Sequence, residues 1–203
     1  AIKIASKYQG LKKDKIIYTD ISYHGKTHAT LSVSGIEGSK KYFKQLDGCI
    51  QIPYGDWKSF EKIIKTQCRN DTSQNDIIAI ILEAVNAGKI IVPPKGYLQN
   101  IRRLCDEYEI LLIIDDVFCG FGRTGNLWGS ETYNINPDMI IASKCLTAGF
   151  FPMGAVILNN DIADEFVEIS TQAEEFPHGF TSGGHPVGCA IALKAIDVIM
   201  NEG

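Results

Sequence analysis

Apolar residues along this chain fall into two alternating patterns, short continuous runs and helix-like spacings. Continuous apolar runs are typical of parallel strands that are buried on both faces. They predict strands over residues 14–20, 75–85, 110–116, 138–143 and 154–160. Apolar positions three or four residues apart predict helices over residues 1–10, 55–70, 93–109 and 188–203, with Asp56 as the N-cap of the second. Strands alternating with helices indicate an α/β fold, a mostly parallel sheet with helices on both faces.

Composition narrows the class of protein. The 203 residues are 45% hydrophobic and 22% charged with a net charge of −4, which is typical of a globular protein and offers no basic surface for nucleic acid or membranes. The six cysteines are scattered without a C-x-x-C pair, which favours reduced thiols in a cytoplasmic protein over a disulfide or zinc framework. We expect no nucleic-acid partner, no membrane partner and no metal.

Candidate chemistry lies where the apolar runs stop, because ligands of open parallel sheets bind at the carboxyl ends of the strands. The polar residues there are Glu83, Asp115, Asp116 and Lys144. Lys144 is the only charged residue in positions 139–158, whose glycines and proline also exclude a membrane helix. A lysine in such an apolar unit costs desolvation energy unless its pKa falls or it is used covalently. We therefore expect a buried, desolvated amine suited to Schiff-base chemistry.

Residues 111–125, "LLIIDDVFCGFGRTG", admit three other interpretations. A dinucleotide site at its G-x-G-x-x-G would need a helix directly after the glycines, and the two aspartates before them would repel phosphate. A phosphate-loop NTPase with Asp115 on magnesium would need a G-x-x-x-x-G-K-[ST] loop, which these 203 residues lack. An aspartate can also simply cap a turn.

The combination of Lys144 with Asp115 favours pyridoxal phosphate instead. A lysine amine can hold the cofactor aldehyde as an imine, and a carboxylate can pair with the protonated pyridine nitrogen. Neither nucleotide interpretation uses both groups.

Five blocks of the sequence resemble the class III (omega-type) aminotransferases, pyridoxal-phosphate enzymes of fold type I. They are "YHGKT" at 23–27, "ILEAV" at 81–85, the segment 93–125, the segment 136–156 and "HGFTSGGHPVGCAIAL" at 178–193. The "CGFGRTGNLWGSETY" segment is most similar to the branch that acts on amines, or omega-amino acids, and pyruvate. The resemblance implies transfer of an amino group from an amine or amino-acid donor to a keto-acid acceptor, by a homodimer or higher oligomer.

The same resemblance implies roles around the cofactor ring. Lys144 would form the imine and later move a proton between the substrate carbon and the cofactor. Asp115 would pair with the pyridine nitrogen. Val117 and Tyr23 would lie on opposite faces of the ring, with Tyr23 stacking on it.

Further roles follow at the edges of the site. Thr181 would donate to the cofactor phosphate from the partner subunit, and Glu83 would lie near the phenolic oxygen. His24 and Gly25 join the cofactor-binding set through the "YHGKT" block, although His24 by itself is expected to be structural. Arg123 in the glycine loop is also expected to be structural.

The sequence departs from the family pattern at several positions. Asp116 replaces the usual glutamate, and Phe118 stands where the family often has a polar residue. Lys89 lies near the position of an acid in ornithine- and GABA-type members, which disfavours those subfamilies. Phe150 and Phe151 are candidates to line the substrate pocket.

The resemblance also implies that residues 1–203 form a pyridoxal-phosphate-binding large domain that is incomplete at both ends. A Gly-Ser phosphate-binding turn would precede them, and a substrate-binding arginine and a small domain would follow. We expect these residues alone to self-associate through uncovered apolar surfaces, to hold the cofactor weakly and to turn over little. A non-catalytic remnant, or a racemase or aminomutase using the same site, is the remaining alternative.

Overall fold

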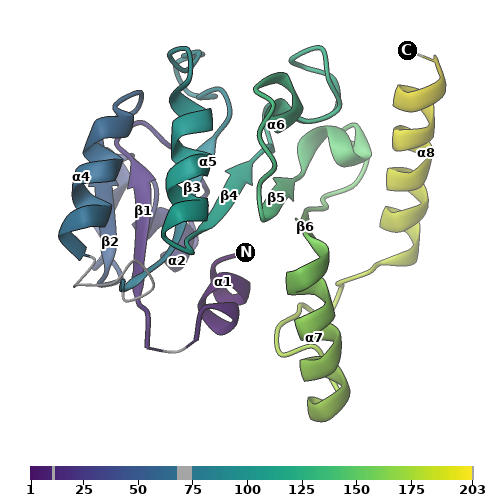
Figure 1. The fold of residues 1–203 in the computed structure, drawn as a ribbon. Helices are drawn as coiled ribbons and strands as arrows, with labels where there is room; N and C mark the ends of the chain where they lie inside the picture. Colours follow the sequence, from purple (N-terminus) through teal and green to yellow (C-terminus); the bar gives the residue numbers. More distant parts are fainter. Residues whose placement is uncertain (11, 68–74, 203) are drawn as a thin grey trace.

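A computed structural model describes residues 1–10, 12–67 and 75–202, and its centre is one six-stranded sheet (Figure 1). The strand order is β2-β1-β3-β4-β5-β6. The strands are β1 (Lys15–Thr19), β2 (Cys49–Ile52), β3 (Ile77–Glu83), β4 (Leu111–Asp115), β5 (Met139–Ala142) and β6 (Ala155–Leu158). Every neighbouring pair is parallel except β5 and β6, which are antiparallel. The predicted mostly parallel sheet is confirmed.

Helices cover both faces of this sheet, as predicted. The helices are α1 (Ile2–Tyr8), α2 (His28–Ser32), α3 (Glu37–Lys40), α4 (Trp57–Gln67), α5 (Tyr97–Glu107), α6 (Gly129–Thr132), the 3₁₀ helix η1 (Lys144–Thr147), α7 (Asn160–Ala173) and α8 (Pro186–Glu202). Helices α4 and α5 pack on one face through Phe60 and Ile101, and α1 and α7 pack on the other through Ile4 and Phe166. Burying apolar side chains on both faces explains the continuous apolar runs of the central strands.

The predicted elements are all present, with ends shifted by a few residues. Asp56 caps α4 as expected, because the Ser59 N–H donates to its Oδ1 at 3.3 Å. The last residues of the predicted helix 55–70 lie outside the described residues. The elements that were not predicted are β2, α7 and the short helices α2, α3, α6 and η1. Strand β2 is a short, half-exposed edge strand, and the apolar residues of α7 are less concentrated on one face than those of α4 and α5.

Helix α8 stands at the side of the molecule and contacts the rest through η1 (Figure 1). Ala192 packs there against Leu146 and Phe121, while Leu193 and Met200 are exposed. In the part of the chain that the structure describes, no helix combines the length and the apolar character needed to cross a membrane.

The parallel strands bring their carboxyl ends to one edge of the sheet. Glu83, the last residue of β3, pairs in register with Asp115, the last residue of β4, and Asp115 also pairs with Ile141 of β5. The loops that follow these strands therefore converge, and the candidate site forms where they meet.

Candidate functional site

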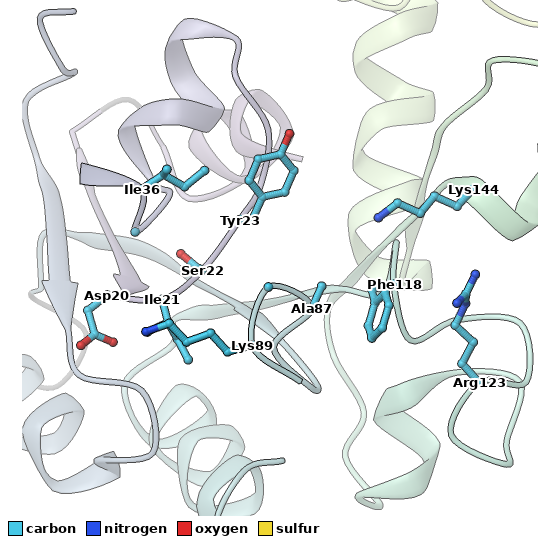
Figure 2. Close-up of a pocket in the computed structure, with 12 residues that line it drawn as sticks. Asp20, Ile21, Ser22, Tyr23, Ile36, Ala87, Lys89, Phe118, Arg123 and Lys144 are labelled. Atoms are coloured by element: carbon cyan, nitrogen blue, oxygen red, sulfur yellow. The ribbon is translucent and has the colours of Figure 1, made fainter. Parts of the chain in front are cut away.

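A cavity of about 620 Å³ opens at the carboxyl edge of the sheet (Figure 2). Its walls come from the segments after four parallel strands: Tyr23 follows β1, Lys89 follows β3, Phe118 and Arg123 follow β4, and Lys144 follows β5. The volume is within the range of small-molecule sites. Two aromatic rings and three positively charged side chains thus face one space.

Lys144 lies on the turn that joins β5 to β6. Its backbone is in the left-handed region, with φ 45°, and the turn is closed by hydrogen bonds from Ser143 Oγ to the Met153 carbonyl (2.7 Å) and from Thr147 Oγ1 to the Phe151 carbonyl (2.6 Å). The side chain is exposed at the cavity, so the prediction of a buried, desolvated amine is wrong for this chain. The apolar residues around it in sequence pack into the sheet and η1, while the turn carries the amine outward.

The Lys144 amine faces the aromatic wall. Its Nζ lies 5.9 Å from the centre of the Phe118 ring, a cation–π distance. Phe118 thus occupies the position that the resemblance marked as commonly polar, and it lies beside the lysine.

Asp115 ends β4 with its side chain almost fully buried, at 8% exposure. One carboxylate oxygen, Oδ1, accepts from the Val117 N–H at 3.1 Å. The other, Oδ2, lies 2.7 Å from His24 Nδ1. The structure thus brings Asp115, Val117 and His24 together, as three of the predicted cofactor-binding residues.

The turn of Tyr23, His24 and Gly25 is held by side chains from other segments. The Tyr23 N–H donates to Glu83 Oε2 at 3.1 Å, and the His24 N–H donates to Ser34 Oγ at 2.9 Å. Gly25 has φ 121°, and a Cβ there would lie 2.8 Å from Thr30 Oγ1, so only glycine fits. This turn aims the Tyr23 ring at the cavity.

Glu83 is buried beneath this turn, and its carboxylate connects the loop after β1 to the loop after β3 by hydrogen bonds. Besides the Tyr23 N–H, it accepts from Asn86 Nδ2 at 2.8 Å and from the Ala87 N–H at 3.0 Å. Asn86 Nδ2 also donates to the Ile21 carbonyl at 2.8 Å, which ties the β3 loop to the β1 loop. Burial raises the pKa of Glu83. Its placement near the phenolic oxygen of a cofactor stays a prediction.

Of the predicted cofactor-binding residues, Lys144 and Tyr23 line the cavity itself. The cavity lining does not include Asp115, Val117, His24, Gly25 or Glu83, which are joined to one another and to the Tyr23 turn by the hydrogen bonds above.

Three further predicted residues lie away from both groups. Thr181 is exposed in the segment between α7 and α8, and its expected role in the partner subunit's site stays a prediction. Phe150 lines a separate hollow with Ile191 of α8, and Phe151 packs on the His185 ring with centres 5.0 Å apart. The expectation that Phe150 and Phe151 line the lysine pocket is therefore wrong for this cavity, because the turn after Lys144 directs both rings toward α8.

Arg123 has a larger part than the sequence suggested. It lines the cavity, its Nη2 lies 3.2 Å from Cys145 Sγ, and its guanidinium carbon lies 5.3 Å from the centre of the Phe118 ring. Its place in the loop that follows the strand carrying Asp115 was the available signal. With Lys89 and Lys144 it outweighs the one acidic side chain in the lining, Asp20, so the cavity carries a net positive charge.

Asp116 anchors the glycine loop behind the cavity. Its Oδ2 accepts from the Gly129 N–H at 2.8 Å, and its carbonyl accepts from the Gly120 N–H at 2.7 Å. Burial raises the pKa of Asp116 to about 6. The glycines are followed by α6, a helix of only 4 residues, so the dinucleotide interpretation of this loop is wrong.

Known proteins are similar to this chain in sequence and in fold. The family model Aminotransferase class-III matches residues 1–203. Beta-alanine–pyruvate aminotransferase of Pseudomonas aeruginosa is 36% identical over 100% of this chain and 50% of its own length, and ornithine aminotransferase of Oceanobacillus iheyensis is 37% identical over 100% and 49%. The two relatives are named for different substrates, and this chain is about equally identical to both.

Solved structures agree with the sequence comparison. An omega-aminotransferase from Paracoccus denitrificans superposes with a TM-score of 0.89 and 40% identity, over 100% of this chain and 49% of its own. A PLP-bound aminotransferase mutant from Vibrio fluvialis gives 0.87 and 40%, over 100% and 49%. The chain spans about half the length of the relatives it matches. The family match overturns the hypothesis of a magnesium-dependent NTPase.

Proposed function

The chain belongs to the class III aminotransferases, and we propose that the whole protein transfers an amino group from an amine or omega-amino acid to a keto acid such as pyruvate, with pyridoxal phosphate as cofactor. The observation that carries this proposal is the shared cavity of Lys144, Tyr23 and Phe118 at the carboxyl edge of the sheet, next to Asp115. The similarity to a beta-alanine–pyruvate aminotransferase and to omega-aminotransferases supports the substrate class.

The residues present fit this cofactor. Lys144 offers a primary amine that reaches the cavity, and Tyr23 offers an aromatic face. Each carboxylate oxygen can accept two hydrogen bonds, and each oxygen of Asp115 has one protein donor. Asp115 therefore keeps acceptor capacity for a protonated pyridine nitrogen.

The chemistry divides between the cofactor and the side chains. When bound, pyridoxal phosphate supplies an electron sink for the carbon that loses its proton. Lys144 Nζ would hold the cofactor aldehyde until the substrate amine displaces it, and the freed amine would then take the proton from the substrate carbon and return it on the cofactor side. Asp115 would hold the proton of the pyridine nitrogen in place, and the Tyr23 ring would orient the cofactor and keep water from one face.

The charge of the cavity suits a carboxylate-bearing substrate. Lys89 and Arg123 both line it, and a guanidinium is a strong partner for carboxylates. We further propose that residues 1–203 form most of a cofactor-binding large domain in a cytoplasmic homodimer or higher oligomer, and that Thr181 serves the partner subunit's cofactor phosphate. Ser182 and Gly183, which adjoin Thr181, are also exposed and open to such a contact.

The test uses the full-length protein and a matched pair of variants. We expect the parent protein and the surface control Lys62→Ala to develop visible absorbance with pyridoxal phosphate and to turn over only when a keto acid is present. Lys144→Ala should lose the covalent absorbance and about a thousandfold or more in turnover, because the proton-transfer group is gone.

Each other outcome contradicts part of the proposal. Covalent absorbance that survives in Lys144→Ala would exclude this lysine. Turnover without a keto-acid acceptor would indicate a racemase or aminomutase. A parent protein that neither binds the cofactor nor turns over would be a non-catalytic remnant.

A further inference from the structure

Lys89 carries a positive charge on the side of the cavity away from the reactive amine. Figure 2 shows its side chain on the same wall as Asp20, while Lys144 and Arg123 lie on the opposite wall. Lys89 belongs to the loop after β3, whereas Lys144 follows β5. The cavity therefore has an amine for chemistry on one wall and a second cation on the other.

The backbone of Lys89 is fixed by Asn86. The Lys89 N–H donates to Asn86 Oδ1 at 3.0 Å, and the Asn86 N–H donates to the Ile91 carbonyl at 3.0 Å, which closes the turn around Lys89. Asn86 Nδ2 also donates to the Ile21 carbonyl and to Glu83 Oε2, each at 2.8 Å. A turn held by four hydrogen bonds presents the lysine from one point of the cavity wall, so that only its side chain has room to move.

The amine of Lys89 is open to a ligand. The side chain is exposed, and within residues 1–10, 12–67 and 75–202 it forms no ion pair. Asp20, on the same wall, is bonded elsewhere, because its Oδ1 accepts from the Tyr54 N–H at 2.9 Å. A lysine that protein carboxylates leave unpaired at the wall of a cavity can bind a carboxylate of the substrate.

The two walls meet different substrate carboxylates. Arg123 and Lys144 lie close together, since both are within 6 Å of the Phe118 ring centre, at 5.3 and 5.9 Å. A carboxylate next to the reacting carbon, as in pyruvate, must stay on that side. In an omega-amino acid the carboxylate is at the far end of the molecule, and its methylene groups carry it toward Lys89. A simple amine offers Lys89 nothing to bind.

We propose that Lys89 is a specificity residue that binds the remote carboxylate of an omega-amino acid donor and so favours omega-amino acids over simple amines. The inference rests on the proposed function, because it requires the amino group of the donor to be at Lys144. The contact forms equally in the bound substrate and in the transition state, so it should lower KM and leave kcat unchanged. Because Lys89 is exposed, the contact should weaken as ionic strength rises.

The first test compares donors that differ only in the carboxylate. With the full-length protein and pyruvate as acceptor, 4-aminobutyrate is paired with propylamine, and 5-aminopentanoate with butylamine. In Lys89→Met, which keeps the side-chain length without the charge, we expect KM for both omega-amino acids to rise about tenfold, the lower end for a hydrogen bond between charged groups because the site is exposed. KM for the amines and for pyruvate, and every kcat, should stay within about twofold.

Two variants serve as controls for this comparison. Lys89→Arg keeps the charge and should keep the preference, and Lys62→Met removes an exposed lysine of α4 and should change nothing. A similar loss for amines and omega-amino acids in Lys89→Met would show that the residue only shapes the turn, and would overturn the proposal. A parent protein that uses no donor would contradict the proposed function, whereas a parent and a Lys89→Met variant with the same preference would contradict this inference alone.

The second test changes the charge of the same wall in opposite directions. Asp20→Asn keeps an acceptor for the Tyr54 N–H and removes a negative charge, so KM for 5-aminopentanoate should fall by about threefold. Lys89→Glu should raise that KM by about a hundredfold and should improve the use of 1,4-diaminobutane relative to butylamine, because the far end of the donor then meets a carboxylate. An unchanged preference between the diamine and butylamine would overturn the assignment of Lys89 to the far end of the donor.

Discussion

Two sides of the cavity are built in opposite ways, the carboxylate side at the ends of β3 and β4 and the lysine turn between β5 and β6. On the carboxylate side, Glu83 and Asp115 are buried, and protein donors reach every carboxylate oxygen of the two. On the lysine side, the Lys144 side chain is exposed and its backbone has φ 45°. One side is fixed by the folded chain, and the other projects from a short turn.

The difference follows the chemistry proposed for each side. A carboxylate that orients a cofactor works best when its own position is set before binding, which multiple hydrogen bonds from rigid segments achieve. An amine that exchanges one partner for another during a reaction needs room to move. We therefore expect mutations on the carboxylate side to affect folding and cofactor binding together, and mutations at Lys144 to affect chemistry with little effect on folding.

The largest stability effect should come from Glu83→Ala. The substitution leaves the N–H groups of Tyr23 and Ala87 and the Asn86 amide without their acceptor. Each buried donor left unpaired costs about 1–3 kcal/mol, and water will reach some of them, so we expect a loss of about 3 kcal/mol. Urea unfolding measures this, with Glu168→Ala, which removes an exposed glutamate of α7, as the control. Equal unfolding midpoints for Glu83→Ala and the control would show that the hydrogen bonds accepted by Glu83 add nothing to the free energy of unfolding.

A smaller, pH-dependent effect should arise at Asp116. Burial raises its pKa in the folded state to about 6, above about 3.9 in the unfolded chain. The folded state therefore holds the proton more tightly, so this contribution to stability is complete below pH 4 and is lost as the pH rises through 6. We expect the free energy of unfolding to fall by about 2 kcal/mol between pH 4 and pH 7 relative to Asp116→Asn.

The Asp116 prediction is tested by comparing the pH dependence of unfolding in the parent protein with that in the Asp116→Asn variant. Urea unfolding of the parent and of Asp116→Asn at pH 4, 5, 6 and 7 gives the difference in slope directly. Parallel pH profiles would show that the Asp116 carboxyl has the same pKa in the folded and unfolded chains.

The smallest effect should come from Lys144→Gly, and its sign is opposite. A non-glycine residue in the left-handed region costs about 1–2 kcal/mol, and glycine costs about 0.5–1 kcal/mol through the flexibility of the unfolded chain. We expect Lys144→Gly to gain about 0.5 kcal/mol. Lys144→Ala keeps the backbone cost and should show no gain in thermal unfolding. A gain in both variants would mean that the lysine side chain, not its backbone, is the source.

The sheet could be predicted because its strands are buried on both faces. The apolar runs of β3 and β4 have no polar positions before Glu83 and Asp115, and only the ends of such runs are ambiguous. Strand β2 escaped prediction because it is four residues long and half-exposed, and α7 because acidic residues such as Asp164 and Glu168 dilute its apolar stripe.

The sequence named candidate site residues, and the structure shows which of them lie together. Strand ends and the family resemblance together pointed to Lys144, Asp115 and Tyr23. Lys144 and Tyr23 line one cavity, and Asp115 contacts His24, the neighbour of Tyr23. The His24–Asp115 pair joins segments 91 residues apart, and no local pattern encodes such a contact. The exposure of Lys144 was missed because sequence neighbours were taken as spatial neighbours, whereas the turn separates them.

The strand order has a consequence for the time at which the site appears during folding. Pairing of β1 with β3 closes a loop of about sixty residues, because Lys15 lies opposite Ile77. Pairings between distant segments form slowly, because the chain must close a long loop before it gains any contact energy. Tyr23 and His24 meet Glu83 and Asp115 only through that pairing. Cofactor capture should therefore be among the last events of refolding, and the growth of cofactor absorbance would follow the completion of the central sheet rather than the early formation of helices.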